Sequence, residues 1–303
     1  MRTGYVLGLD THGFHRMHYT DWGDPASERV VICVHGFTRN GRDFDYLAQR
    51  LAGACRVVCP DIAGRGRSDW LIHKEDYDYS QYMSDVTALI ARVGAWPAPS
   101  NWFGKLADFL ARRYRSRSLY WVGTSMGGML GMLLAARAKS PIRKLVLNDI
   151  GPLIPKSSLE RIGAHVGNDP RFATFGELKA YVREISATFG PLTDAQWHHL
   201  TLHGARQYED GKWGLCYDPD VALPLRKSPL QDIDLWQCWD AIECPTLVLR
   251  GAESDLLLQE TALEMQRRGP RARLVEFSGV GHAPMLMTPD QIAAVKDFLL
   301  APG

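Results

Sequence analysis

The segment Gly123-Thr124-Ser125-Met126-Gly127 has the pattern Gly-x-Ser-x-Gly, which can present a serine hydroxyl as a nucleophile. A β-branched, apolar run (118–122, SLYWV) precedes it, and a stretch with apolar residues at helical spacing (126–138) follows. A sharp turn between strand and helix strains its central residue, and the flanking glycines leave room where a Cβ would clash. We therefore expect Ser125 to stand clear of the backbone at the start of a helix.

A serine that attacks a carbonyl group needs hydrogen-bond donors for the negative charge that develops on the substrate oxygen. The helix after Ser125 would direct its first amides at this charge, so the N–H of Met126 is one expected oxyanion donor. The run His35-Gly36-Phe37-Thr38 follows another strand-like segment (29–34), and the N–H of Phe37 is the second. His35 itself is expected to hold this loop by a hydrogen bond.

The serine hydroxyl also needs a base, because it is a weak nucleophile at neutral pH. His282 fits best among the ten histidines, since it follows the last strand-like run (272–277) in the loop Ser278-Gly279-Val280-Gly281-His282. The others lie in the expected edge hairpin, in loops or in the helical middle of the chain. His199 and His203 would share a helix face and could form a pair of metal ligands. The glutamate of an HExxH motif and an evident third ligand are both missing, so we expect no metal site.

The imidazole in turn needs a carboxylate that fixes its tautomer. Asp255 is the preferred candidate, because it follows the run Thr246–Leu249 and gives the order serine, aspartate, histidine along the chain. Asp149 comes directly after the strand-like run 143–148 (RKLVLN) and is a competitor, otherwise expected in the pocket floor. Glu253 is a weaker rival.

Elements that could position these residues alternate along the chain as strands and helices, which is the pattern of a parallel sheet. Strands are expected at 29–34, 55–59, 118–122, 143–147, 246–249 and 272–277, after an edge hairpin at 5–9 and 14–19. Helices are expected at 44–51, 79–93, 126–138 and 291–300.

The alternation stops between Gly151 and about Leu235, where prolines, aromatics and helix-like patches (177–188, 195–202) replace the strands. We expect residues 1–152 and 236–303 to form the core and residues 153–235 to form an inserted helical cap. A second interruption, 96–117, is expected to be a loop followed by a short basic helix.

Composition excludes several partners. The 303 residues carry 35 basic and 34 acidic side chains, a net charge of +1, which gives no field for nucleic acid or an anionic membrane. The start of the chain shows neither a signal peptide nor a membrane span, so we expect a cytoplasmic protein. A small-molecule substrate is the expected partner, and the chain itself is expected to be a monomer or a homodimer.

These motifs together resemble the α/β-hydrolase superfamily. The resemblance covers about residues 30–93, 118–149 and 244 to the C-terminus, and it is carried by VHGF at 34–37, PDIAGRGRSDW at 60–70, GTSMGG at 123–128, LVLNDIGP at 145–152, LVLRGAESD at 247–255 and GVGHAP at 279–284. It implies a mostly parallel eight-stranded sheet flanked by helices, a helical cap after the sixth strand, and no metal or organic cofactor. The family's nucleophile, acid and base map onto Ser125, Asp255 and His282, and its oxyanion donors onto Phe37 and Met126.

The expected activity is that of a carboxylesterase-like serine hydrolase, which cleaves an ester through an acyl-enzyme on Ser125. A carbon–carbon bond hydrolase, a lactonase or a perhydrolase would use the same residues, so these alternatives stay open. Haloalkane dehalogenases and epoxide hydrolases resemble this fold but carry an aspartate where this chain has Ser125. A non-catalytic ligand receptor on the same fold is the alternative from another class.

Overall fold

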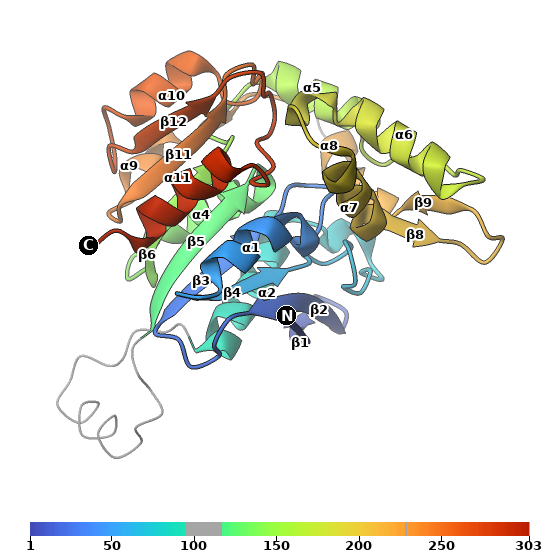
Figure 1. The fold of residues 1–303 in the computed structure, drawn as a ribbon, viewed down its shortest axis with the longest axis horizontal. Helices are drawn as coiled ribbons and strands as arrows, with labels where there is room; N and C mark the ends of the chain where they lie inside the picture. Colours follow the sequence, from blue (N-terminus) through green and yellow to red (C-terminus); the bar gives the residue numbers. More distant parts are fainter. Residues whose placement is uncertain (95–116, 228, 303) are drawn as a thin grey trace.

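An eight-stranded sheet forms the centre of the protein (Figure 1). The computed structural model describes residues 1–94, 117–227 and 229–302. The strand order is β1-β2-β4-β3-β5-β6-β11-β12. The strands are β1 (Arg2–Leu9), β2 (Phe14–Trp22), β3 (Arg29–Val34), β4 (Arg56–Pro60), β5 (Ser118–Thr124), β6 (Ile142–Asn148), β11 (Thr246–Gly251) and β12 (Arg273–Phe277).

The sheet is parallel from β4 to β12, while the β1–β2 hairpin joins β4 in antiparallel pairing. All predicted strands are present. The central ones read as continuous apolar runs because both faces of a parallel sheet are covered by helices. In β3, for example, every residue from Val30 to Val34 is buried. Parallel pairing also brings the carboxyl ends of β3, β5, β6 and β11 to one edge, where the predicted site residues follow.

Helices cover both faces of the sheet. α1 (Asp45–Leu51) and α11 (Pro289–Leu300) pack side by side on one face, together with the 3₁₀ turn η1 (Gly41–Phe44). α2 (Tyr79–Val93), α4 (Met126–Ala135) and α9 (Trp236–Asp240) share the core of the other face, to which α10 (Gln259–Met265) also contributes. The predicted helices at 44–51, 79–93, 126–138 and 291–300 are therefore present within a few residues.

Between β6 and β11 the chain leaves the sheet and forms small elements. These lie together beyond the carboxyl ends of the parallel strands (Figure 1). We call residues 153–235 the helical insertion. Its elements are β7 (Leu153–Ile154), α5 (Lys156–His165), α6 (Phe175–Ile185), η3 (Ala187–Phe189), α7 (Asp194–Gly204), β8 (Ala205–Gln207), β9 (Trp213–Leu215), η4 (Pro219–Ala222), α8 (Leu223–Lys227) and β10 (Ile233–Asp234).

Two of these helices, α6 and α7, correspond to the patches predicted at 177–188 and 195–202. Each begins at a threonine that forms a capping box with the glutamate or glutamine three residues later. The loop and basic helix predicted at 96–117 fall, except for Arg117, outside the described residues, as does any contact they make. No helix in the described ranges is long and apolar enough to cross a membrane.

Candidate active site

Ser125 lies at the turn between β5 and α4 with backbone angles φ 51° and ψ −117°. This positive φ is unusual for a residue with a side chain and is the strained turn that the sequence predicted. A Cβ on Gly123 would lie 2.2 Å from the carbonyl oxygen of Gly127, and a Cβ on Gly127 would lie 2.0 Å from that of Val34. Only glycine therefore fits at either position, and Ser125 is lifted out of the backbone between them.

His282 lies in the loop after β12 and contacts Ser125. Its Nε2 is 3.0 Å from Oγ of Ser125. The loop is fixed from the sheet side by Asn148 at the end of β6, whose amide donates to Thr124 Oγ1 at 2.9 Å and to the carbonyl of Pro284 at 2.7 Å. The structure thus brings the two predicted residues, Ser125 and His282, within hydrogen-bond distance of each other.

The carboxylate that contacts His282 is that of Asp149. Its Oδ2 lies 2.7 Å from Nδ1 of His282, and its side chain is completely buried. The same carboxylate accepts hydrogen bonds from Ser254 Oγ at 2.5 Å and from the backbone N–H of Gly251 at 2.9 Å. Three donors therefore hold Asp149 in place, one from the end of β11, one from the loop after it and one from the loop after β12. Ser125, His282 and Asp149 form a continuous hydrogen-bonded chain.

The prediction that Asp255 orients His282 is wrong. The Asp255 side chain is 52% exposed and forms an ion pair with Arg161 of α5, with Oδ2 2.5 Å from Nε and Oδ1 2.8 Å from Nη2. Its backbone carbonyl accepts a hydrogen bond from Ser158 of the same helix at 2.7 Å. Asp255 therefore ties the helical insertion to the core, because the loop after β11 points its side chain away from the histidine. Ser254, one residue earlier, is the one that turns inward.

The loop after β3 holds the residues predicted to bind an oxyanion. Gly36 brings it close to Ser125, since a Cβ on this glycine would lie 3.7 Å from Cβ of Ser125. Phe37 lines the same cavity as Ser125, and Met126 is the first residue of α4, whose N–H has no partner within the helix. Both amides thus belong to the elements that border the serine.

His35 and Arg65 hold this loop from behind. His35 Nδ1 is 2.7 Å from the carbonyl of Gly36, and its Nε2 accepts the N–H of Ile62 at 2.9 Å, which fixes Nδ1 as the protonated nitrogen. Burial lowers the pKa of His35 to about 4, so the ring is neutral and structural, as predicted. Arg65, which the sequence did not single out for this role, donates from Nε to the carbonyl of Phe37 at 2.8 Å.

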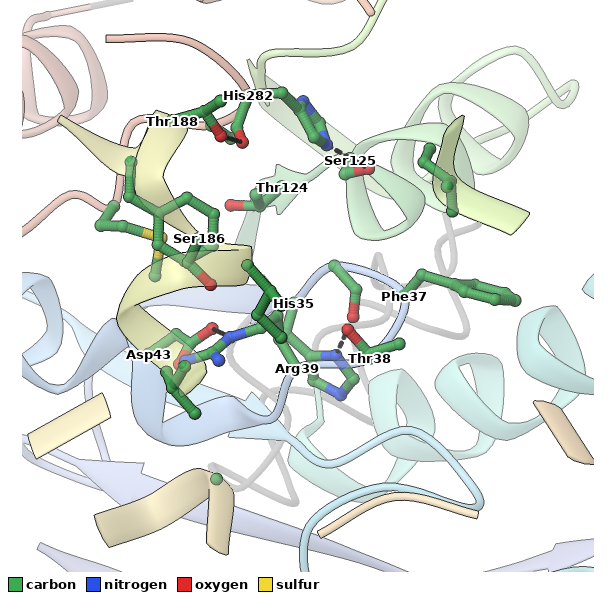
Figure 2. Close-up of a pocket in the computed structure, with 18 of the residues that line it drawn as sticks. His35, Phe37, Thr38, Arg39, Asp43, Thr124, Ser125, Ser186, Thr188 and His282 are labelled. Atoms are coloured by element: carbon green, nitrogen blue, oxygen red, sulfur yellow. Dashed lines mark hydrogen bonds and ion pairs between the residues drawn. The ribbon is translucent and has the colours of Figure 1, made fainter. Parts of the chain in front are cut away.

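A cavity of about 180 Å³ opens above Ser125, and Figure 2 shows Ser125, His282, Phe37 and Arg39 around it. Its walls come from the loops of the sheet and from α5, α6, η3 and β9 of the helical insertion, and most of the surface is apolar. Thr188 of η3 reaches the histidine loop, since its Oγ1 donates to the carbonyl of His282 at 2.7 Å. No sequence signal points to Arg39, Arg161 or Thr188, because the insertion and the core border one cavity only in the folded chain.

One cluster in the described part of the chain has donor atoms close enough for a metal ion. Side-chain atoms of Asp45, His199 and His203 all lie within 4.8 Å of one another. The guanidinium of Arg42, however, already pairs with the carboxylate of Asp45 and lies 3.3 Å from Nδ1 of His203. Burial, and then the charge of Arg42, lower the pKa of His203 to about 4. Because the positively charged guanidinium of Arg42 already contacts Asp45 and His203, this cluster is a poor metal site. Its contacts join α7 to the core.

The sequence pattern of the Alpha/beta hydrolase family matches residues 31–295. The chain belongs to this family. It is 48% identical over 305 residues to the 3-hydroxybutyrate-oligomer hydrolase of Cupriavidus necator, an alignment that covers 98% of this chain and 97% of that protein.

Solved structures agree with this assignment of the fold. An alpha/beta hydrolase from Novosphingobium aromaticivorans is 35% identical and superposes with a TM-score of 0.82 over 98% of this chain and 97% of its own. A protein from Rickettsia typhi, 27% identical, has a TM-score of 0.88 with both chains fully covered. The predicted superfamily and the predicted eight-stranded fold are therefore confirmed, and the chain is a hydrolase of this family.

Proposed function

We propose that this protein hydrolyses carboxylic esters through an acyl-enzyme, with Ser125 as nucleophile, His282 as general base and Asp149 as the orienting acid. The observation that carries the proposal is the relay from Ser125 Oγ through His282 to Asp149, with separations of 3.0 and 2.7 Å. Asp149 fixes the imidazole with its proton on Nδ1, which leaves Nε2 free to accept the serine proton.

The reaction then takes two steps. Ser125 Oγ attacks the ester carbonyl carbon while its proton moves to Nε2 of His282. The resulting oxyanion accepts hydrogen bonds from the N–H groups of Phe37 and Met126. His282 gives this proton to the departing alcohol, and the acyl group remains on Ser125. Water then attacks the acyl-enzyme with His282 again as base, so the acid is released and the serine hydroxyl is restored.

Short hydroxyacyl esters are the proposed substrate class, and oligomers of 3-hydroxybutyrate are the representative. The similarity to the hydrolase of Cupriavidus necator over nearly the full length of both chains supports this choice. A cavity of about 180 Å³ with mostly apolar walls supports it as well, because each unit of such an oligomer adds only a methyl-bearing three-carbon backbone.

We also propose that the helical insertion, residues 153–235, is a cap domain on a core made of residues 1–152 and 236–303. Support comes from the cavity, whose walls include Ile162, Val182 and Phe189 of the insertion as well as Ser125 and His282 of the core. A substrate in this cavity would be enclosed by both, so the insertion would select the acyl chain while the core carries out the chemistry.

Replacement of Ser125 by alanine tests the proposal. We expect hydrolysis of 3-hydroxybutyrate dimer and of short acyl esters to fall by about 10⁴-fold or more, since residual rates without the nucleophile come from the oxyanion donors and binding alone. A fluorophosphonate probe should label Ser125 in the folded wild type and nothing in the alanine variant. If the folded wild-type protein takes up no probe on Ser125 and cleaves no ester, the chain is a ligand receptor on a hydrolase fold.

A further inference from the structure

The charges that line the cavity are unequal. Among the described residues, its wall holds the guanidinium groups of Arg39 and Arg161 but a single carboxylate, that of Asp43. Arg39 belongs to the loop after β3 and reaches the nucleophile side of the cavity, because its Cγ and the Cβ of Ser125 both lie within 3.8 Å of the position that a Cβ of Gly36 would occupy. An arginine thus lines the same cavity as the serine, although an ester hydrolysis as such requires none there.

The orientation of Arg39 leaves part of its guanidinium available. Nε and Nη2 donate to the two oxygens of Asp43 at 2.8 and 2.7 Å, and this pair occupies one edge of the planar fork (Figure 2). Within the part of the chain that the structure describes, Nη1 has no hydrogen-bond partner, and it lies beside Gly204, which lines the cavity. Asp43 and the ring of Phe189 hold the group in place, so it can bind an anion with little loss of side-chain entropy.

The chemistry of the proposed substrate supplies such an anion in a fixed place. In a linear oligomer of a hydroxy acid, the alcohol side of every ester bond leads to the free carboxylate and the acyl side leads to the free hydroxyl. At the last ester bond of a 3-hydroxybutyrate oligomer, four bonds separate the ester carbonyl carbon from the terminal carboxylate carbon, about 5 Å in an extended chain. Ser125 and Arg39 line the same cavity, so an oligomer whose last ester carbonyl lies at Ser125 places its terminal carboxylate in the space that Arg39 borders.

We propose that Arg39 binds the free carboxylate of the departing hydroxy acid and thereby directs cleavage to the last ester bond at the carboxyl end of the oligomer. This inference rests on the proposed function. One hydroxy acid leaves in each turnover, and an ester whose terminal carboxylate is masked loses the contact. Arg39 is thus a specificity-determining residue, and the reaction that supplies the substrate must produce oligomers with free carboxyl ends.

The test compares linear 3-hydroxybutyrate dimer with its methyl ester, in which only the carboxylate charge is removed. Cleavage of the internal ester is followed by chromatography of the released hydroxy acid or its methyl ester, and kcat/KM is measured for both. We expect the wild type to favour the free acid by roughly 10- to 100-fold, the effect of one charge-assisted hydrogen bond. The double variant Arg39→Gln with Asp43→Asn, which leaves no buried carboxylate unpaired, should bring this ratio close to one.

A matched control lies a few residues further along the chain, in η1 and at the start of α1. Arg42 and Asp45 form a similar ion pair that does not line the cavity, and Arg42→Gln with Asp45→Asn should keep the wild-type ratio. An unchanged ratio in the Arg39 variant, or an equal fall in the control, overturns the inference while leaving the esterase proposal intact. A fall in Arg161→Gln instead assigns the carboxylate to that residue. A folded wild type that cleaves neither ester refutes the proposed function itself.

Discussion

The substitution Asp149→Asn gives the sharpest test of how this site works, because it removes one charge and almost no volume. The carboxylate of Asp149 is completely buried and accepts hydrogen bonds from His282, Ser254 and Gly251. An asparagine has one acceptor oxygen in place of two. The N–H of Gly251 donates to Oδ1, whereas Ser254 Oγ and His282 Nδ1 both contact Oδ2. An amide oxygen in the place of Oδ1 would keep the bond from Gly251, so the NH₂ group would take the place of Oδ2 and face the Ser254 hydroxyl, which can accept, and Nδ1 of His282.

This arrangement reverses the tautomer of the histidine. An NH₂ group that donates to Nδ1 places the ring proton on Nε2, where it points at Ser125 and prevents the ring from accepting the serine proton. It also removes the negative charge that stabilises the imidazolium in the transition state. The expected cost is about 10³- to 10⁴-fold in kcat, the loss known for the same change in a serine-protease triad.

Asp255→Asn is the matched comparison, since it is the same change in the other carboxylate that the sequence offers. Asp255 is half exposed and pairs with Arg161, so its replacement should alter stability by about 1 kcal/mol or less and kcat by no more than a few-fold. Both variants are assayed on 3-hydroxybutyrate dimer, and urea unfolding confirms that they fold. If Asp255→Asn loses more activity than Asp149→Asn, Asp149 is not the carboxylate that orients His282 in the reaction.

Three further changes test the elements around the site. Gly127→Ala should destabilise the fold by several kcal/mol in urea unfolding, because the new Cβ meets a backbone carbonyl at 2.0 Å, whereas Gly53→Ala, with no atom within 4 Å, should stay within about 0.5 kcal/mol. Thr188→Val removes the hydrogen bond to the carbonyl of His282 and should lower kcat up to about 5-fold with little effect on labelling of the nucleophile. Burial lowers the pKa of His35 to about 4, so the unfolded chain binds a proton that the folded chain excludes between about pH 6.5 and 4. The free energy of unfolding should therefore fall as the pH is lowered through this window, and His35 should contribute roughly 3 kcal/mol to that fall. The fall should be smaller in His35→Gln.

Each of these predictions has a result that contradicts it. Equal stability of the two alanine variants would mean that the serine turn tolerates a side chain. Thr87, whose hydroxyl donates to a carbonyl within α2 far from the cavity, serves as the control for Thr188. If Thr87→Val lowers kcat as much, the effect is not specific to the histidine loop. An acid dependence that is the same in His35→Gln and the wild type would show that other groups cause it.

The sequence predicted most of the core because its local signals agree with one another. Apolar runs of strand length alternate with helical spacing, and the glycines around Ser125 permit only one turn, so the strands, Ser125 and His282 all follow from short segments. The structure of the helical insertion is harder to predict from sequence, because its short strands β8 and β9 and its small helix α8 carry little periodicity. Their places are decided by contacts with distant residues.

The acid was misassigned for a reason that can be stated physically. Both aspartates follow parallel strands of the same sheet and both give the order serine, aspartate, histidine along the chain, so order alone cannot distinguish them. Asp149 comes directly after β6, whose last residue is Asn148, while Asp255 lies further along a loop after β11 ends at Gly251. A side chain next to a strand end is held by the sheet, and this distinction was available in the sequence.

The place of Asp149 has a consequence for the order in which the site is completed as the chain is synthesised. Ser125 and Asp149 follow neighbouring strands, β5 and β6, and so leave the ribosome close together, before any part of the helical insertion. His282 arrives last, in the loop after β12. A chain that still lacks this segment would hold the serine without the histidine proposed as its base, so the proposed ester cleavage would require the third of the three residues to have been made.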